Sequence, residues 1–440
     1  MIKVGFVSLG CAKNLVDTEV MLAKLATEGY ELTPEETEAD IIIINTCAFI
    51  ESAKQESIES IIDLGWLKEH HKLKGIVVCG CLAERYYEEI KNDLPEVDAI
   101  VGIGSIDEIV KAVKTVEKGE KFYSHKDKEQ SVLGGDRVLT TGSYAYLKIA
   151  EGCDNRCTYC AIPLIRGRMR SRPMEEIVAE AKDLEKLGVK ELCVIAQDTS
   201  RYGLDLYGEY KLAELIRRIT AETQIPWIRL LYLYPDKITD ELVEEIKNNP
   251  RVVKYADIPI QHISDNMLKA MGRHGGSEII RSAIKRLRDA VPDITLRTTV
   301  MVGFPGETEE DHEELLKFIK EVKFDRLGAF TYSPEENTVA ATLPGEVDEQ
   351  TKQDRYDDVM SVQLEVSAAR GKKLIGRKMR VLCESFDIPA EVYVGRSEAD
   401  APDVDGKVFF TSEKKVREGQ FVTVKISEAE DYDLVGETVR

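Results

Sequence analysis

Three cysteines lie close together in the segment EGCDNRCTYC, with the spacing C-x3-C-x2-C. Cys153, Cys157 and Cys160 cannot all point to one side of a regular strand or helix, whereas a loop lets them converge. A structural zinc site would need a fourth ligand nearby, but the next cysteine is Cys193 and no histidine has ligand spacing. Three thiolates on a 4Fe–4S cluster leave one iron open for chemistry. The spacing predicts such a cluster, with structural zinc as the alternative.

A second set of three cysteines is spread along the first part of the chain. Cys11, Cys47 and Cys81 each follow a β-branched run and precede a segment with helical spacing. In an open parallel sheet the loops at the carboxyl ends of neighbouring strands meet at one crevice. We therefore expect a second three-thiolate site, with buried structural cysteines as the alternative. The remaining cysteines are assigned to the hydrophobic core: Cys79, Cys193 and Cys383.

The elements that must position these thiols fall into three predicted domains. Residues 1–125 alternate strands (2–9, 41–45, 75–79 and 99–103) with helical segments, which predicts an open parallel α/β sheet. Residues 139–370 contain strand candidates at 144–150, 192–196, 227–233, 255–260, 295–302 and 327–331, and end in a connecting helix. This part predicts a partial (βα)6 TIM-like barrel, with another doubly wound sheet as the alternative. Residues 371–440 predict a small antiparallel β-barrel of the OB-like type.

Composition and charge indicate a globular protein that binds metal. The chain has 440 residues, of which 43% are hydrophobic and 32% charged, as in globular proteins with large cores. Neither a signal peptide nor an apolar run long enough for a membrane span is recognised, so we expect the protein in the cytoplasm. Nine cysteines, an odd number in such a chain, argue for metal binding or catalysis rather than a disulfide framework. The net charge of −20 favours basic partners and disfavours phosphate backbones.

The motifs resemble one known family. EGCDNRCTYC after the first barrel strand is similar to the signature of radical S-adenosylmethionine (SAM) enzymes. Together with the first and last domains it resembles the methylthiotransferases, and SLGCAKNLVDTE, NTCAFIESAKQES and GCLAERY resemble their RimO type. YLKIAEGC, IRGRMRSRP and GRSEADAPDVDG point the same way, and the last domain is similar to the TRAM domain. The tRNA-modifying MiaB branch typically lacks the KNLVD run.

The resemblance implies a site and a reaction. Cys153, Cys157 and Cys160 would bind a 4Fe–4S cluster whose open iron holds SAM, the source of a 5′-deoxyadenosyl radical that takes hydrogen from Cβ of an aspartate. A second 4Fe–4S cluster would deliver the sulfur, and another SAM would supply the methyl group. Its ligands would be Cys11, Cys47 and Cys81. Candidate SAM contacts are Tyr159 beside the adenine, Gln197 and Asp198 beside the methionine amino group, and Gln261 and Arg297 near later strand ends. For Arg297 a salt bridge inside the barrel is the alternative.

The resemblance also implies the partners. The substrate would be the small-subunit ribosomal protein S-twelve, and the electron would come from a reductant such as flavodoxin or ferredoxin. We expect no membrane and no tRNA as partners, because residues 371–440 contain 12 Lys and Arg against 14 Asp and Glu. Two alternatives stay open. One is a tRNA adenosine methylthiotransferase, and the other is a non-catalytic iron–sulfur or zinc protein that binds ribosomes.

Overall fold

The computed structural model describes residues 2–131 and 133–439. Its first part is a six-stranded parallel sheet in the order β2-β1-β3-β4-β5-β6. The strands are β1 (Lys3–Ser8), β2 (Glu31–Thr33), β3 (Ile41–Thr46), β4 (Gly75–Gly80), β5 (Ala99–Val101) and β6 (Phe122–Ser124). The four predicted strands form its centre. The two edge strands were missed because three residues are too few to show a periodic pattern.

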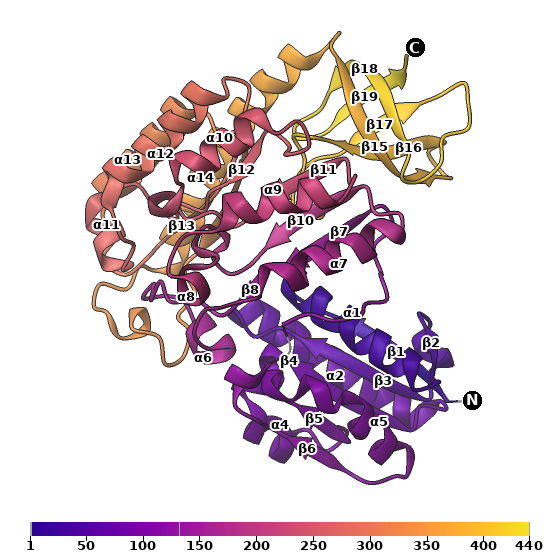
Figure 1. Cartoon of the computed structure of the whole chain (residues 1–440). Helices are drawn as coiled ribbons and strands as arrows, with labels where there is room; N and C mark the ends of the chain where they lie inside the picture. Colours follow the sequence, from indigo (N-terminus) through magenta and orange to yellow (C-terminus); the bar gives the residue numbers. More distant parts are fainter. Residues whose placement is uncertain (1, 132, 440) are drawn as a thin grey trace.

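Helices cover both faces of this sheet (Figure 1). On one face α1 (Ala12–Thr27) and α5 (Ile109–Glu117) pack their apolar side chains against the sheet. The other face is covered by α2 (Glu51–His70), α3 (Cys81–Arg85) and α4 (Tyr87–Asp93). Both faces are therefore buried, which explains why the central strands are continuously apolar. The predicted open parallel α/β sheet is confirmed.

The middle of the chain forms a partial barrel of six parallel strands in two halves, β11-β10-β7 and β12-β13-β14. The strands are β7 (Tyr144–Lys148), β10 (Glu191–Ile195), β11 (Trp227–Leu230), β12 (Tyr255–Asp257), β13 (Thr295–Val302) and β14 (Arg326–Thr331). Beyond the paired strands, the backbone N–H of Leu233 donates to the carbonyl of Asp257 at 2.9 Å and links the halves. The expected (βα)6 arrangement is confirmed.

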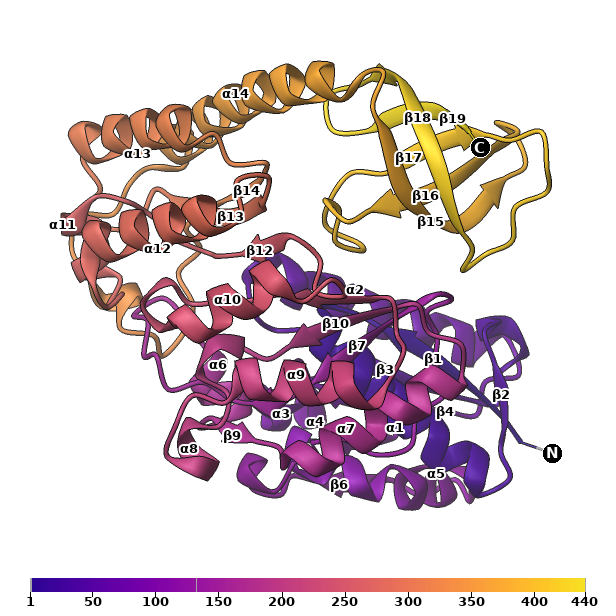
Figure 2. The ribbon, with the colours of Figure 1, turned by 45° about the horizontal axis from the view of Figure 1, so that its top comes forward.

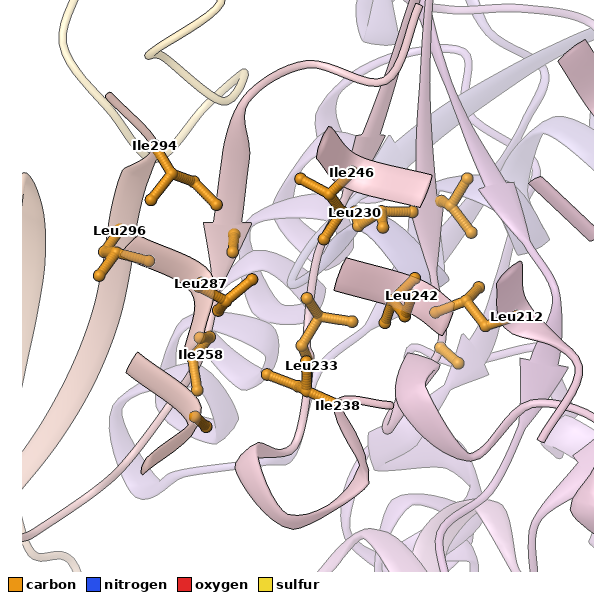
Figure 3. Packing of buried hydrophobic residues seen from close by; sticks show 14 of the residues in the cluster. Leu212, Leu230, Leu233, Ile238, Leu242, Ile246, Ile258, Leu287, Ile294 and Leu296 are labelled. Carbon is orange, nitrogen blue, oxygen red and sulfur yellow. The ribbon is translucent and has the colours of Figure 1, made fainter. Parts of the chain in front are cut away.

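Amphipathic helices surround the barrel and bury its outer face. They include α7 (Met174–Lys186), α9 (Leu212–Glu222), α10 (Asp240–Asn248), α12 (Gly276–Ala290) and α13 (Glu309–Val322). Figure 3 shows this layer, where Leu242 of α10 and Leu287 of α12 belong to the same buried cluster as Leu230 of β11. These helices cover only the outside of the barrel. The inside of the open barrel must therefore be filled by side chains from elsewhere in the chain.

The inside of the barrel is filled by all three parts of the chain. One buried cluster joins Trp227 and Tyr255 of the barrel with Val16 of α1 and with Leu382 and Ala401 from the last part of the chain. Each is at most 1% exposed. The partial barrel is therefore stabilised by helix α1 and by the carboxyl-terminal domain, as well as by its own strands.

The last part of the chain is a closed five-stranded barrel in the order β15-β16-β17-β19-β18, which the long helix α14 (Glu349–Leu374) connects to the partial barrel (Figure 2). Its strands are β15 (Lys378–Asp387), β16 (Val392–Ser397), β17 (Val408–Thr411), β18 (Phe421–Ala429) and β19 (Leu434–Thr438). The strands pair in antiparallel fashion as expected, except that β17 and β19 are parallel.

The loop between β16 and β17 docks this small barrel on the amino-terminal ends of the partial-barrel strands. Asp400 forms an ion pair with Arg326, which begins β14. Asp403 accepts hydrogen bonds from the hydroxyls of Tyr144 and Tyr146, at 3.0 and 2.9 Å. The three aspartates of the GRSEADAPDVDG segment thus hold the two domains together, the third being Asp405, which accepts from the hydroxyl of Tyr255 at 2.6 Å.

A buried carboxylate beneath this loop offers a test of the docking. Glu191 of β10 is fully buried, accepts a hydrogen bond from Arg229 at 2.6 Å and forms an ion pair with Arg396 of β16 at 2.7 Å. Replacing one member of a buried ion pair leaves the other charges uncompensated. We therefore expect Glu191→Gln to lower the free energy of unfolding by about 3–5 kcal/mol, measured by urea denaturation.

Asp289→Asn is the matched control, because its ion pair with Lys285 lies on an exposed helix face. That variant should change the free energy of unfolding by less than about 1 kcal/mol. Equal effects of the two substitutions would contradict the role given to Glu191.

Candidate functional site

The first predicted cysteine triad lies at the carboxyl ends of three adjacent strands. Cys11 precedes α1 and follows β1, Cys47 follows β3, and Cys81 begins α3 directly after β4. The strands β1, β3 and β4 are neighbours in the sheet. The topology thus brings the three loops to one edge of the sheet, as the sequence predicted.

Two glycines let these loops approach one another closely. A Cβ atom on Gly10, which precedes Cys11, would lie 2.9 Å from Cβ and 3.1 Å from Sγ of Cys47. A Cβ atom on Gly80, which precedes Cys81, would lie 2.5 Å from the carbonyl oxygen of Thr46. Both glycines also have a positive φ, 88° and 91°, which disfavours other residues. Either substitution would push the thiol-bearing loops apart.

Asn14 of α1 connects the same three loops. Its side-chain amide donates to the carbonyls of Leu9 and Thr46, at 3.0 and 2.9 Å. Its Oδ1 accepts from Arg166 and lies 3.7 Å from Sγ of Cys81. Asn14 therefore fixes the loops around Cys11 and Cys47 while it contacts the third thiol directly. Our sequence reasoning missed it, although it stands three residues after Cys11.

The charges around the thiols set their protonation. Burial raises the pKa of Cys81 to about 12, nearby Arg166 opposes this shift, and the charges of Cys47 and Cys11 add to it. Burial likewise raises the pKa of Cys47. The Arg166 guanidinium lies 3.8 Å from Sγ of Cys81. These thiols are therefore protonated without metal and would release protons on binding one.

The second triad lies on a loop between β8 (Ala150–Glu151) and α6 (Ile162–Arg166). The backbone N–H of Cys153 donates to the carbonyl of Gly167 at 3.2 Å, and that of Cys160 to the carbonyl of Cys157 at 3.1 Å. All three thiols are free and partly exposed. Burial raises the pKa of Cys153 to about 12, and the charge of Asp198 adds to the shift.

The donor set of each triad fits an iron–sulfur cluster in kind and in placement. Each offers three free thiols on loops at strand ends, next to a buried cation or to tyrosine hydroxyls. Among the described residues, no three His, Cys, Asp or Glu side chains converge as they stand into a metal-binding group. The triads therefore match an iron–sulfur cluster in the chemistry of their ligands and in the position of their loops. The ligand roles of the six cysteines stay predictions.

Aromatic side chains and one arginine surround the second triad. Tyr159 accepts a hydrogen bond from Arg273 at 3.3 Å, and its ring meets that of Phe304 edge-on. The Arg273 guanidinium stacks 4.2 Å above the ring of Tyr234, whose hydroxyl lies 3.8 Å from Sγ of Cys157. Tyr159 thus lies within an aromatic wall, and its contact with an adenine stays a prediction. Arg273 and Tyr234 were missed, although Tyr234 follows a predicted barrel strand.

Two of the other predicted SAM contacts lie against the triad loop. The Gln197 amide donates to Glu151 at 2.6 Å, two residues before Cys153. Asp198 accepts from the side chain of Asn155 at 2.7 Å, inside the loop itself. Both lie at the end of β10, where a parallel barrel carries its site. Their proposed contact with the methionine amino group stays a prediction.

The remaining two predicted contacts lie farther along the barrel edge. Gln261 bridges to β13 through its backbone, since its N–H donates to Thr299 and its carbonyl accepts from Met301. The Arg297 guanidinium pairs with Asp257 at 3.0 Å and with Asp405 at 3.4 Å. This is the salt bridge inside the barrel that we considered as the alternative. A cofactor role for either residue stays a prediction.

A buried ion network joins the two thiol-bearing domains. Lys148 at the end of β7 and Arg166 at the end of α6 both bind Asp17 of α1 and Glu151. The four side chains are at most 6% exposed. We call them the junction network. Because Arg166 also contacts Cys81, the network reaches from the barrel to the first triad.

Family comparisons match three parts of the chain. Residues 147–319 match the Radical SAM superfamily, residues 3–102 match a family described as uncharacterized protein family UPF0004, and residues 375–439 match the TRAM domain. These matches coincide with the partial barrel, the parallel sheet and the small closed barrel. No helix among the described residues is long and apolar enough to cross a membrane.

Curated relatives match the chain over nearly its whole length. Ribosomal protein uS12 methylthiotransferase RimO of Acetivibrio thermocellus is 49% identical and covers 99% of this chain and 98% of its own. The protein of the same name from Caldanaerobacter subterraneus is 50% identical, with 99% and 100% covered. Among solved structures, the radical SAM methyltransferase TsrM of Kitasatospora setae matches with a TM-score of 0.56 at 14% identity, covering 76% of each chain. That last likeness shows the fold alone.

Thiol reactivity tests the site geometry. In metal-free protein at pH 8, a Cys81 pKa of about 12 leaves about one thiol in ten thousand ionised, against about one in four for an ordinary thiol of pKa about 8.5. Only the thiolate reacts with iodoacetamide, so Cys81 should be alkylated roughly a thousandfold more slowly in the folded protein than in denatured protein, where it is an ordinary thiol. Peptide mass spectrometry would measure both rates. Equal rates in folded and denatured protein would contradict the buried site.

Proposed function

Because the chain belongs to the RimO family of ribosomal protein uS12 methylthiotransferases, we propose that it attaches a methylthio group to Cβ of an aspartate in uS12. The enzyme is a radical SAM methylthiotransferase. The observation that supports the proposal best is the junction network, which ties the thiol loops of both domains into one site. Such a reaction needs a radical source and a sulfur source close to the same substrate carbon.

The enzyme uses an iron–sulfur cluster and SAM. We assign this cluster to Cys153, Cys157 and Cys160, and we propose a second 4Fe–4S cluster on the other triad, made of Cys11, Cys47 and Cys81. When bound, these groups supply the sulfur atom, the methyl group, and a carbon radical that takes hydrogen from the substrate.

The side chains of the chain itself hold and shield these groups. Arg166 balances the charge of the thiolate at Cys81, and Asn14 keeps the three loops of that triad together. Around the other triad, Tyr159, Arg273 and Tyr234 form a wall that excludes water. Water exclusion protects a reactive intermediate from side reactions. We propose SAM contacts for Tyr159 and for four other side chains: Gln197, Asp198, Gln261 and Arg297.

The charge of the chain supports a protein substrate. Ribosomal proteins are basic, so a chain with a net charge of −20 attracts them at long range. The TRAM domain has slightly more acidic than basic residues, 14 against 12, which disfavours tRNA as the substrate. We further propose that a reductant such as flavodoxin or ferredoxin supplies electrons and that the protein acts in the cytoplasm.

The direct test incubates the reconstituted protein anaerobically with SAM, a reductant and either uS12 or tRNA. Mass spectrometry should find a methylthio group on uS12 only. Modified tRNA beside unmodified uS12 would refute the proposed substrate. One zinc per chain in place of about eight irons would refute the radical chemistry.

Cysteine variants separate the two triads. Cys81→Ala should lower the iron content from about eight to about four per chain, abolish methylthiolation of uS12, and leave reductive cleavage of SAM in place. Cys157→Ala should abolish SAM cleavage as well. Iron analysis and detection of 5′-deoxyadenosine measure these outcomes.

Cys79→Ala is the matched control, because Cys79 lies two residues before Cys81 but inside β4, fully buried in the sheet core. It should keep both clusters and both activities. Loss of iron in Cys79→Ala, or full iron in Cys81→Ala, would contradict the ligand assignment.

A further inference from the structure

One buried lysine beside the first triad has no charged partner. Lys13 of α1 is 6% exposed, and among the described residues its ammonium group takes part in no ion pair or hydrogen bond. It lies 3.1 Å from the ring centroid of Tyr232, at the carboxyl end of β11. Burying a charge without a partner is costly, and such groups concentrate at functional sites. The Lys13 ammonium is therefore available to pair with an anionic group of a ligand.

The neighbouring carboxylates already have other partners. The groups whose charges act on Lys13 are Cys11, Arg166, Asp257 and Glu151. Asp257 accepts from Arg297 and from the backbone N–H of Tyr232, at 3.0 and 2.9 Å. Glu151 is bound within the junction network. Neither carboxylate is thus free to pair with Lys13.

The first turn of α1 adds a second feature. Cys11 is its N-cap residue and forms no side-chain capping hydrogen bond, and the first turn contains no acidic residue. The positive end of the helix dipole is therefore uncompensated next to the Lys13 ammonium. The two features together describe a subsite for one small anion between α1 and the end of β11.

The cation that contacts the thiols of the first triad is Arg166 rather than Lys13. The Arg166 guanidinium donates to Sγ of Cys81 at 3.8 Å. Lys13 lies against a barrel residue, Tyr232, on the side of the partial barrel. The Lys13 ammonium is therefore placed to pair with an anionic group held at the barrel.

We propose that Lys13 binds the side-chain carboxylate of the target aspartate and so selects an acidic side chain over its neutral amide. This inference rests on the proposed function, because it names what the same site recognises in uS12. A carboxylate held there would pair with the ammonium group and place the adjacent Cβ between the barrel and Cys11. The subsite thereby lets the enzyme recognise its substrate by the negative charge of the side chain.

Binding measurements test the proposal without turnover. The reconstituted protein with SAM is titrated anaerobically with uS12 and with uS12 whose target aspartate is replaced by asparagine. Loss of one partner of a desolvated charge pair weakens binding by about 30-fold or more. We expect this preference for aspartate in the wild type, and less than about threefold preference in Lys13→Met and in Lys13→Gln.

Two variants serve as controls. Lys13→Arg keeps the charge and should keep most of the preference. Lys24→Met removes a cation from the last turn of the same helix and should bind both forms of uS12 as the wild type does. The second neutral variant, Lys13→Gln, keeps a polar head group, so the conclusion does not depend on the folding of one protein.

The outcomes separate this inference from the proposed function. A preference for aspartate that survives in Lys13→Gln would overturn the role of Lys13, even if the enzyme methylthiolates uS12. The absence of any preference in the wild type would do the same. Failure of the wild type to modify uS12, by contrast, would refute the proposed function whatever the binding data show.

Discussion

The junction network is the interaction on which the rest of the structure depends. Asp17, Lys148, Glu151 and Arg166 are buried together where helix α1 meets the partial barrel. Two carboxylates face two cations, so the charges balance and each ion is held from both sides. Breaking such a network by removing one member leaves an uncompensated buried charge. The network therefore fixes the orientation of the two thiol-bearing domains, beyond what apolar packing would specify.

The incomplete barrel explains why this orientation matters. A six-stranded arrangement leaves its interior open, and here α1 fills it from the first domain while the loop with Ala401 fills it from the last. The amino-terminal strand ends are closed by aspartates of the small barrel. At the carboxyl-terminal ends, the Tyr234 hydroxyl lies 3.8 Å from Sγ of Cys157, and Lys13 of α1 lies over the ring of Tyr232. The three domains consequently pack as one unit around the barrel.

Much of this could be predicted from the sequence. The central strands are runs of β-branched residues, and three cysteines at three strand ends indicated a convergent site because parallel topology brings such ends together. Asn14, Arg166 and Lys13 could not be found in this way. Their roles depend on contacts between residues more than a hundred positions apart, such as that of Arg166 with Asn14, which no local pattern reports. The parallel pair of β17 and β19 likewise depends on strand order rather than on alternation.

The most direct test of the proposal that two clusters face each other across the junction is electron paramagnetic resonance of the fully reconstituted, reduced protein. The account predicts spectra in which the two paramagnetic clusters show mutual spin–spin coupling, and a simple single-cluster signal once Cys81 is replaced by alanine. A wild-type spectrum that is merely the sum of two isolated clusters would contradict it.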